Sequence, residues 1–118
     1  MADAGLFIGF GAPVRGRETQ ALELFNESLE YYGRLQDEGE IESIEPVFLE
    51  PHGGDLSGFI LLRGDAEKLA AIRVSDDFTQ LAIRAGLYVD SLGIVGASMA
   101  ERLQRNMAYY TEQIGAIA

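Results

Sequence analysis

The sequence predicts an α+β protein in which one antiparallel sheet carries helices on one of its faces. Short apolar runs bounded by glycine and proline alternate with stretches of helical periodicity. Their order is β α β β α β, followed by one more helix. With 118 residues, of which 47% are hydrophobic, the chain has enough apolar side chains for one core, so residues 1–118 are expected to form a single domain.

The first strand is expected at Gly5–Val14, a short apolar segment that Pro13 helps to end. Residues 17–39 have the spacing of a helix. Their apolar side chains recur at steps of 3, 4 and 3: Leu22, Phe25, Leu29 and Tyr32. Gly39 is a typical C-terminal stop for this helix.

A β-hairpin is expected next. Ile41–Pro51 and Leu56–Gly64 have the composition of strands, and the glycine-rich residues 52–55 form the turn between them. Pro46 lies inside the first of these strands and cannot donate a hydrogen bond to a neighbouring strand. That strand is therefore expected at the edge of the sheet or at a bulge.

Two helical segments and a last strand follow the hairpin. Asp65 is expected to cap a helix at residues 66–74, and Ser75 is expected to restart helical structure at residues 76–85. Gly86–Ala97 is apolar at most positions and is expected to be the fourth strand.

The C-terminal helix is expected to begin with a capping box. In this motif a serine bonds to the first helical turn, and a glutamate three residues later bonds back to the serine. Ser98 and Glu101 have this spacing. Beyond them, four apolar residues lie on one side of the predicted helix: Leu103, Met107, Tyr110 and Ile114.

The order of elements is that of the ferredoxin-like plait, whose own helices cover only one face of the sheet. A face in contact with water would alternate apolar with polar side chains. Here both faces are apolar. In the first strand Ile8 alternates with Phe7, and in the third strand Ile60 alternates with Phe59 and Leu61, so each strand has apolar residues on both sides. Another copy of the same sheet is the simplest cover for the second face, so the sequence predicts a homodimer.

In this pattern the chain resembles the dimeric α/β barrel superfamily, in which two ferredoxin-like subunits pack sheet against sheet. The resemblance covers nearly the whole chain. Three stretches are similar to those of small uncharacterised bacterial members: EPHGGDLSGFILLRG, FTQLAIRAGLYVDSLGIV and YYTEQI. Other members include cofactor-free monooxygenases, haem-dependent chlorite dismutases and dye peroxidases, YCII-like proteins and ligand-sensing domains. The resemblance implies a site inside the barrel or between sheet and helices, whereas the chemistry differs among members.

Composition argues against several classes of function. Nine basic and nineteen acidic residues give a net charge of -10, which disfavours nucleic acid as a partner. The chain has no cysteine and one histidine, so no metal or cofactor is expected. No segment has the roughly 20 apolar residues of a membrane span, and the N-terminus lacks the basic region of a signal peptide. A cytoplasmic bacterial protein is therefore expected.

His52 and Asp55 are the candidate catalytic residues. A carboxylate beside an imidazole can orient it for general acid–base catalysis. YCII-like proteins are thought to use a histidine and an aspartate, although here both residues lie in a hairpin turn. The alternative is a structural turn, because Gly53 and Gly54 favour one and Asp55 can bond to its backbone.

Arg63 and Arg84 are candidate ligand-binding residues. Each has apolar neighbours, among which a guanidinium can hold a carboxylate or a phosphate. The alternative for both is an ion pair with an acid, and Glu50, Asp65 and Asp90 are available.

Tyr88 and Asp90 are the other two candidate ligand-binding residues. Asp90 and Ser91 interrupt the predicted fourth strand, so they face a cavity or mark a bulge, and Tyr88 adds a hydroxyl. A further segment, Gly9-Phe-Gly11, has two of the three glycines of a dinucleotide-binding turn. The preferred interpretation is that these glycines allow close approach of strands.

Two functions are compatible with these observations. The first is a small-molecule binding protein or a cofactor-free enzyme, with its site in the barrel of a homodimer. The second is a non-catalytic assembly or regulatory module whose barrel is filled with side chains. Bulky apolar residues in the strands favour a filled interior, whereas the strand glycines favour space for a ligand.

Overall fold

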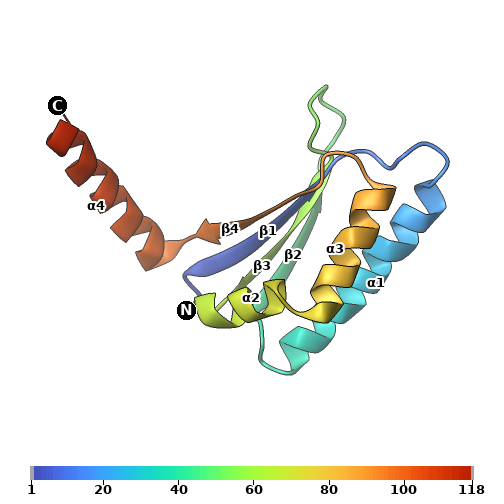
Figure 1. Ribbon diagram of the computed structural model, residues 1–118, viewed down its shortest axis with the longest axis horizontal. Coiled ribbons are helices and arrows are strands. Elements are labelled where there is room, and N and C mark those ends of the chain that lie inside the picture. The colour runs from blue at the N-terminus through green and yellow to red at the C-terminus, as the bar shows by residue number, and fades with distance from the viewer. Residues whose placement is uncertain (1, 118) are drawn as a thin grey trace.

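The structure, a computed structural model, describes residues 2–117 and has an α+β architecture (Figure 1). Its elements in chain order are β1 (Ala4–Phe10), α1 (Glu18–Asp37), β2 (Ser43–Phe48), β3 (Gly58–Gly64), α2 (Ala66–Arg73), α3 (Asp76–Tyr88), β4 (Gly93–Ser98) and α4 (Ala100–Ile117). Helices α1, α2 and α3 lie together on one side of the sheet, and α4 projects away from this body.

The four strands form one sheet in the order β2-β3-β1-β4, and every neighbouring pair is antiparallel. This order confirms the predicted ferredoxin-like plait. β2 is an edge strand, as Pro46 indicated. The predicted caps are also confirmed, because the side chains of Asp65 and Ser75 each accept a hydrogen bond from the amide three residues later.

The core lies between the sheet and helices α1, α2 and α3. Alternate residues of β1 and β3 point into it, among them Leu6, Ile8 and Leu62, and Leu62 is completely buried. Each helix adds the residues of one face: Leu24, Tyr31 and Tyr32 from α1, Leu69 and Ile72 from α2, and Phe78 and Leu81 from α3. The chain's own helices therefore bury one face of the sheet.

The other face of the sheet is apolar as well, and none of the described helices covers it (Figure 1). Phe7 of β1 lies opposite Leu61 of β3 and Val95 of β4, and its ring stacks on Phe59 with 5.1 Å between the centroids. Val95 is 55% exposed. We call these four side chains the open face. The prediction of a sheet with two apolar faces is thus confirmed.

The fourth strand is shorter than predicted. α3 continues through Tyr88 and β4 begins at Gly93, so the strand predicted at Gly86–Ala97 is wrong in its first half. A short apolar run fits a helix as well as a strand. Here the helix continues because Leu81, Ala85 and Tyr88, at steps of 4 and 3, extend the face that packs on the core.

The start of the last helix also differs from the prediction. Ser98 does not open a capping box, because it is the last residue of β4 and its Oγ accepts a hydrogen bond of 2.9 Å from Asn106 Nδ2. α4 begins at Ala100, whose φ is 50°. The serine therefore ties α4 to the end of the strand. In addition, β1 ends at Phe10 rather than Val14, and β2 and β3 stop short of the loop between them.

Candidate functional site

A cavity of about 350 Å³ lies between the sheet and helices α1 and α3. It is found where β1 and β2 end and β3 and β4 begin. Most of its wall is apolar, with contributions from all four strands and both helices: Ile8, Phe10, Leu22, Leu24, Phe25, Phe48, Leu49, Ile60, Leu81, Leu92 and Ile94. Small-molecule sites usually have volumes of roughly 300–1,000 Å³ and mainly apolar walls. The cavity therefore meets both conditions.

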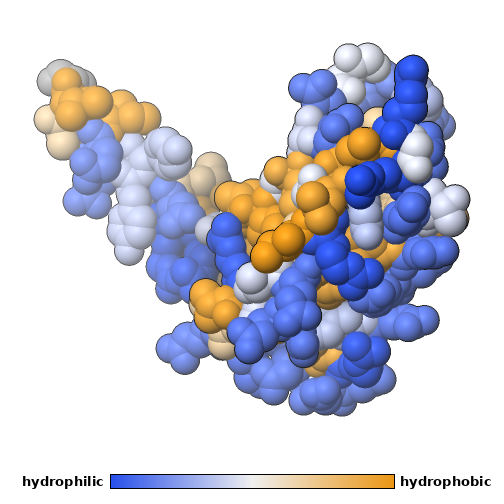
Figure 2. Space-filling view, turned by 45° about the vertical axis from the view of Figure 1, so that its right-hand side comes forward, coloured by the Kyte–Doolittle hydropathy of each residue, from blue (hydrophilic) through white to orange (hydrophobic). Residues whose placement is uncertain are grey.

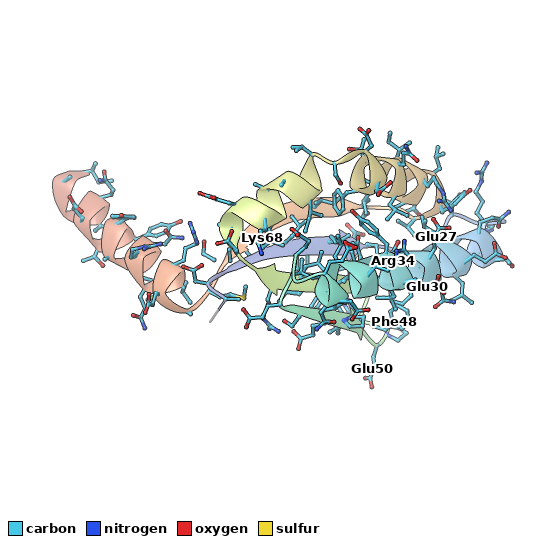
Figure 3. The ribbon with its side chains drawn as sticks, turned by 90° about the horizontal axis from the view of Figure 1, so that it is seen from below. Glu27, Glu30, Arg34, Phe48, Glu50 and Lys68 are labelled. Carbon is cyan, nitrogen blue, oxygen red and sulfur yellow. The ribbon has the colours of Figure 1, made fainter. Side chains whose placement is uncertain are left out.

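Three phenylalanines form one corner of the cavity. Phe25 of α1 lies against Phe48 of β2, with ring centroids 4.9 Å apart. Phe10 of β1 contacts both rings edge to face, at 5.9 and 6.1 Å. In Figure 3, Phe48 lies on the edge strand next to α1, whereas Glu50 points away from the body. Phe48 is 64% exposed, so an aromatic ring stands at the rim of the cavity.

Few polar side chains reach the cavity: Glu18, Ser28, Tyr32 and Ser57. Tyr32 is buried, and desolvation raises the pKa of its hydroxyl far above the usual range, with a smaller contribution from Tyr31. At neutral pH this side chain is an uncharged hydroxyl that can donate one hydrogen bond. The described residues that line the cavity include no histidine. The cavity is thus suited to holding an apolar molecule rather than to general acid–base catalysis by an imidazole.

The raised pKa of Tyr32 predicts a loss of stability at alkaline pH. Below the unfolded tyrosine pKa of about 10, both states keep the proton and burial contributes fully. As the pH rises towards the folded-state pKa, the unfolded chain releases the proton first, so ionisation favours unfolding. We expect Tyr32→Phe to move the midpoint of alkaline unfolding, followed by circular dichroism, to higher pH. Tyr109→Phe removes the hydroxyl of an exposed tyrosine and should leave the midpoint unchanged; identical shifts in the two variants would refute the role of Tyr32.

His52 and Asp55 lie in the loop between β2 and β3, outside the cavity wall. The His52 ring bonds to its own loop: Nδ1 accepts from the Gly54 amide at 3.2 Å, and Nε2 lies 2.8 Å from the Leu56 carbonyl oxygen. The proton is therefore on Nε2, which donates to that carbonyl. Among residues 2–117, no hydrogen bond joins His52 to Asp55. The histidine holds the turn together, and its use in catalysis stays a prediction.

Arg63 and Arg84 are far from each other and both form ion pairs. Arg63 lies beside the open face, and its Nη2 is 3.0 Å from Glu45 Oε2 on the neighbouring strand. Arg84 of α3 makes two hydrogen bonds, of 2.6 and 3.0 Å, to the carboxylate of Glu27 on α1. These bonds lower the pKa of Glu27 and raise the pKa of Arg84. Neither partner is among the acids that the sequence suggested.

Tyr88 and Asp90 are placed by the end of α3. Tyr88 lies one turn after Arg84, and the guanidinium of Arg17 stands over its ring at 5.9 Å. Asp90 is in the exposed turn before β4, so it does not interrupt a buried strand. Neither side chain lines the cavity, although Val89 and Leu92, which flank this turn, do.

Gly11 explains why the two loops with candidate residues lie close together. Its amide donates to the Asp90 carbonyl oxygen at 2.7 Å. A Cβ on Gly11 would lie 2.7 Å from that oxygen and 2.8 Å from the carbonyl oxygen of Asp55. The glycine therefore allows a close approach of backbones, as preferred from the sequence, and its amide is not free to bind a phosphate.

The aromatic corner is the part of the site that sequence reasoning missed. Phe25 was placed on the buried side of its helix, and Phe10 and Phe48 were treated as ordinary strand residues. The predicted strands ran on to Val14 and Pro51, so the sequence did not indicate that Phe10 and Phe48 are the final residues of their strands. The structure brings both rings to the helical side, where they meet Phe25.

Within residues 2–117, no group of three or more histidine, aspartate or glutamate side chains is arranged to hold a metal ion. In the same range, no helix combines the length and the apolar content needed to cross a membrane.

Comparison with known proteins gives a fold and no family. No protein-family model matches the chain, and no curated protein matches it. Among solved structures, it is similar to a dimeric protein of unknown function with a ferredoxin-like fold from Bacteroides fragilis. The TM-score is 0.58 and the identity is 11%; the match covers 81% of this chain and 96% of the other. This similarity supports the fold described above.

Proposed function

We propose that this protein binds a small, mostly apolar molecule in the cavity between its helices and its sheet, and that it works as a homodimer. The cavity carries the proposal: it is about 350 Å³ in volume and has an aromatic corner. This position is one of the two that the resemblance to dimeric α/β barrels implied, between sheet and helices. The barrel interior, the other position, is the contact surface of the proposed dimer.

The chemistry of the wall narrows the class of ligand. Phe10, Phe25 and Phe48 offer ring faces and edges, which suit an aromatic or polycyclic molecule. Tyr32 and Ser28 can each satisfy one polar group of the ligand. Glu18 at the wall and a net charge of -10 disfavour an anion. The preferred ligand is therefore uncharged or cationic.

The proposed dimer forms through the open face. None of the described helices covers its four apolar side chains, and Val95 is 55% exposed. The Bacteroides fragilis structure, which is dimeric, supports the same arrangement. The packing of two such sheets is the arrangement of the dimeric α/β barrels, the superfamily that the sequence resembles. Arg63 and Glu45 would then stand at the margin of the contact.

Filling the cavity tests the proposal. Ala82 and Ala85 of α3 line the cavity, and Ala82→Leu with Ala85→Leu puts two larger side chains into it without a helix-breaking residue. We expect the dissociation constant of a neutral fluorescent probe, N-phenyl-1-naphthylamine, to rise at least tenfold. Ala71→Leu on the exposed side of α2 is the matched control and should bind as the wild type does.

The outcome separates this function from its alternative, a non-catalytic assembly module. Unchanged binding in the filled variant would show that the probe binds elsewhere and would refute the cavity as the site. Native mass spectrometry on protein purified without added ligand gives a second readout, because a retained small molecule appears as extra mass. A protein that binds no probe and retains no ligand would favour the assembly module, for which the open face is the supporting observation.

A further inference from the structure

Helix α4 stands apart from the body of the molecule (Figure 1). Its 18 residues correspond to a length of about 27 Å, and none of its described side chains is buried. It is tied to the body near its start, where Asn106 donates to Ser98 and the Arg102 guanidinium lies 3.9 Å from the Asp3 carboxylate. Figure 2 shows apolar surface over the middle of the body and again towards the free end of this helix.

Five apolar residues form a continuous stripe along α4, which we call the α4 seam. They recur at steps of 4, 3, 4 and 3: Leu103, Met107, Tyr110, Ile114 and Ile117. Their exposed fractions range from 46% to 85%. Steps that alternate between 3 and 4 average 3.5 residues, the repeat with which two helices pack side by side over their full length. The seam is thus suited to another helix rather than to a flat surface.

The residues around the α4 seam fit a partner of the same sequence. The positions that flank it hold uncharged polar side chains: Gln104, Asn106, Thr111 and Gln113. The charged residues of α4 lie elsewhere on the helix: Glu101, Arg102, Arg105 and Glu112. Two basic and two acidic residues sum to zero, so the net charge of -10 belongs to the rest of the chain. Two copies repel each other through their bodies but not through α4.

The α4 seam also needs a partner for stability. A single helix of this length gains little from its own hydrogen bonds in water, and helices in proteins depend on packing of their apolar side. We infer that α4 pairs with α4 of a second copy of this chain, with the two seams facing each other. This contact goes beyond the proposed function, because it requires neither the cavity nor the open face. If the same two copies also pack through their open faces, the α4 contact further stabilises that dimer.

A single introduced cysteine tests the pairing directly, because the chain has none of its own. Tyr110 is the central residue of the α4 seam, so Tyr110→Cys meets its counterpart whether the two helices run parallel or antiparallel. Mild oxidation of the full chain is expected to give a covalent dimer on a non-reducing gel. Ala108→Cys on the other side of the helix is the control, and it should form no covalent dimer on the same gel. Equal crosslinking of the two variants, or none of Tyr110→Cys, would overturn the inference.

Charge substitutions give a non-covalent readout. Met107→Arg with Ile114→Arg places like charges on the α4 seam, and native mass spectrometry should show association weakened at least tenfold. Ala108→Arg with Gly115→Arg adds the same charge away from the seam and should associate as the wild type does. Equal association of the two double variants would contradict the pairing.

The open face and α4 can be tested apart. The oxidation of Tyr110→Cys should be repeated in a chain that also carries Val95→Asp. This second substitution places a charge on the open face and so opposes packing of the two sheets. Crosslinking that persists supports the α4 pair even if the sheets do not associate. Crosslinking that disappears would overturn the inference that α4 is a contact in its own right.

Discussion

Gly11→Ala is expected to lower the free energy of unfolding by about 2–3 kcal/mol, as overpacking of a tight site does. The new Cβ would lie within 2.8 Å of the carbonyl oxygens of Asp55 and Asp90. Both oxygens are backbone atoms, so neither can rotate away as a flexible side chain would. Moving them apart would strain the hydrogen bond of 2.7 Å from the Gly11 amide to Asp90. The loop between β2 and β3 and the turn before β4 would both shift.

Urea denaturation at one fixed protein concentration measures this loss, because association makes stability depend on concentration. Gly86→Ala is the matched control. Gly86 lies inside α3, and a Cβ there meets no atom within 4 Å. This substitution should instead raise stability, by up to about 1 kcal/mol, because alanine favours a helix. Equal changes in the free energy of unfolding for Gly11→Ala and Gly86→Ala would show that close backbone contacts are not the reason for a glycine at position 11.

The parts of the fold that could be predicted depend on local signals. Asp65 and Ser75 were identified as caps because their side chains bond to amides only three residues away. Pro46 indicated an edge strand or a bulge, because the missing amide hydrogen of a proline is visible from that residue alone, and the strand lies at the edge. Residues 86–92 were misassigned for the converse reason. Their local pattern fits two structures, and packing of Tyr88 on the core decides between them.

The candidate site was harder to predict because its parts are distant in the chain. Phe10, Phe25 and Phe48 meet only after α1 has packed on the sheet. Arg84 was a candidate ligand group, and its partner Glu27 is 57 residues away on another helix. No spacing in the sequence points to that pair. His52 attracted attention as the one histidine, whereas its hydrogen bonds lie within its own loop.

In a chain whose α4 carries Met107→Arg and Ile114→Arg, Val95→Asp on the open face should dissociate the proposed dimer into single chains of about 12.9 kDa. Val95 is 55% exposed in the single chain, so the substitution should cost the monomer little. In a contact between two sheets, the carboxylate would be buried among Phe7 and Leu61 without a partner. An unpaired buried charge costs about 3–5 kcal/mol, which weakens association roughly 100-fold or more. Sedimentation equilibrium measures the change directly.

Val74→Asp supplies the same substitution at the end of α2, where the side chain is 79% exposed and away from the open face. It should leave association unchanged. Both variants should be measured with Met107→Arg and Ile114→Arg on α4, because a second contact could keep copies together after the sheets have separated. If Val95→Asp chains still associate in that background, the open face is not the dimer surface. Its four apolar side chains would then be expected to contact another partner, because a large apolar patch exposed to water favours association.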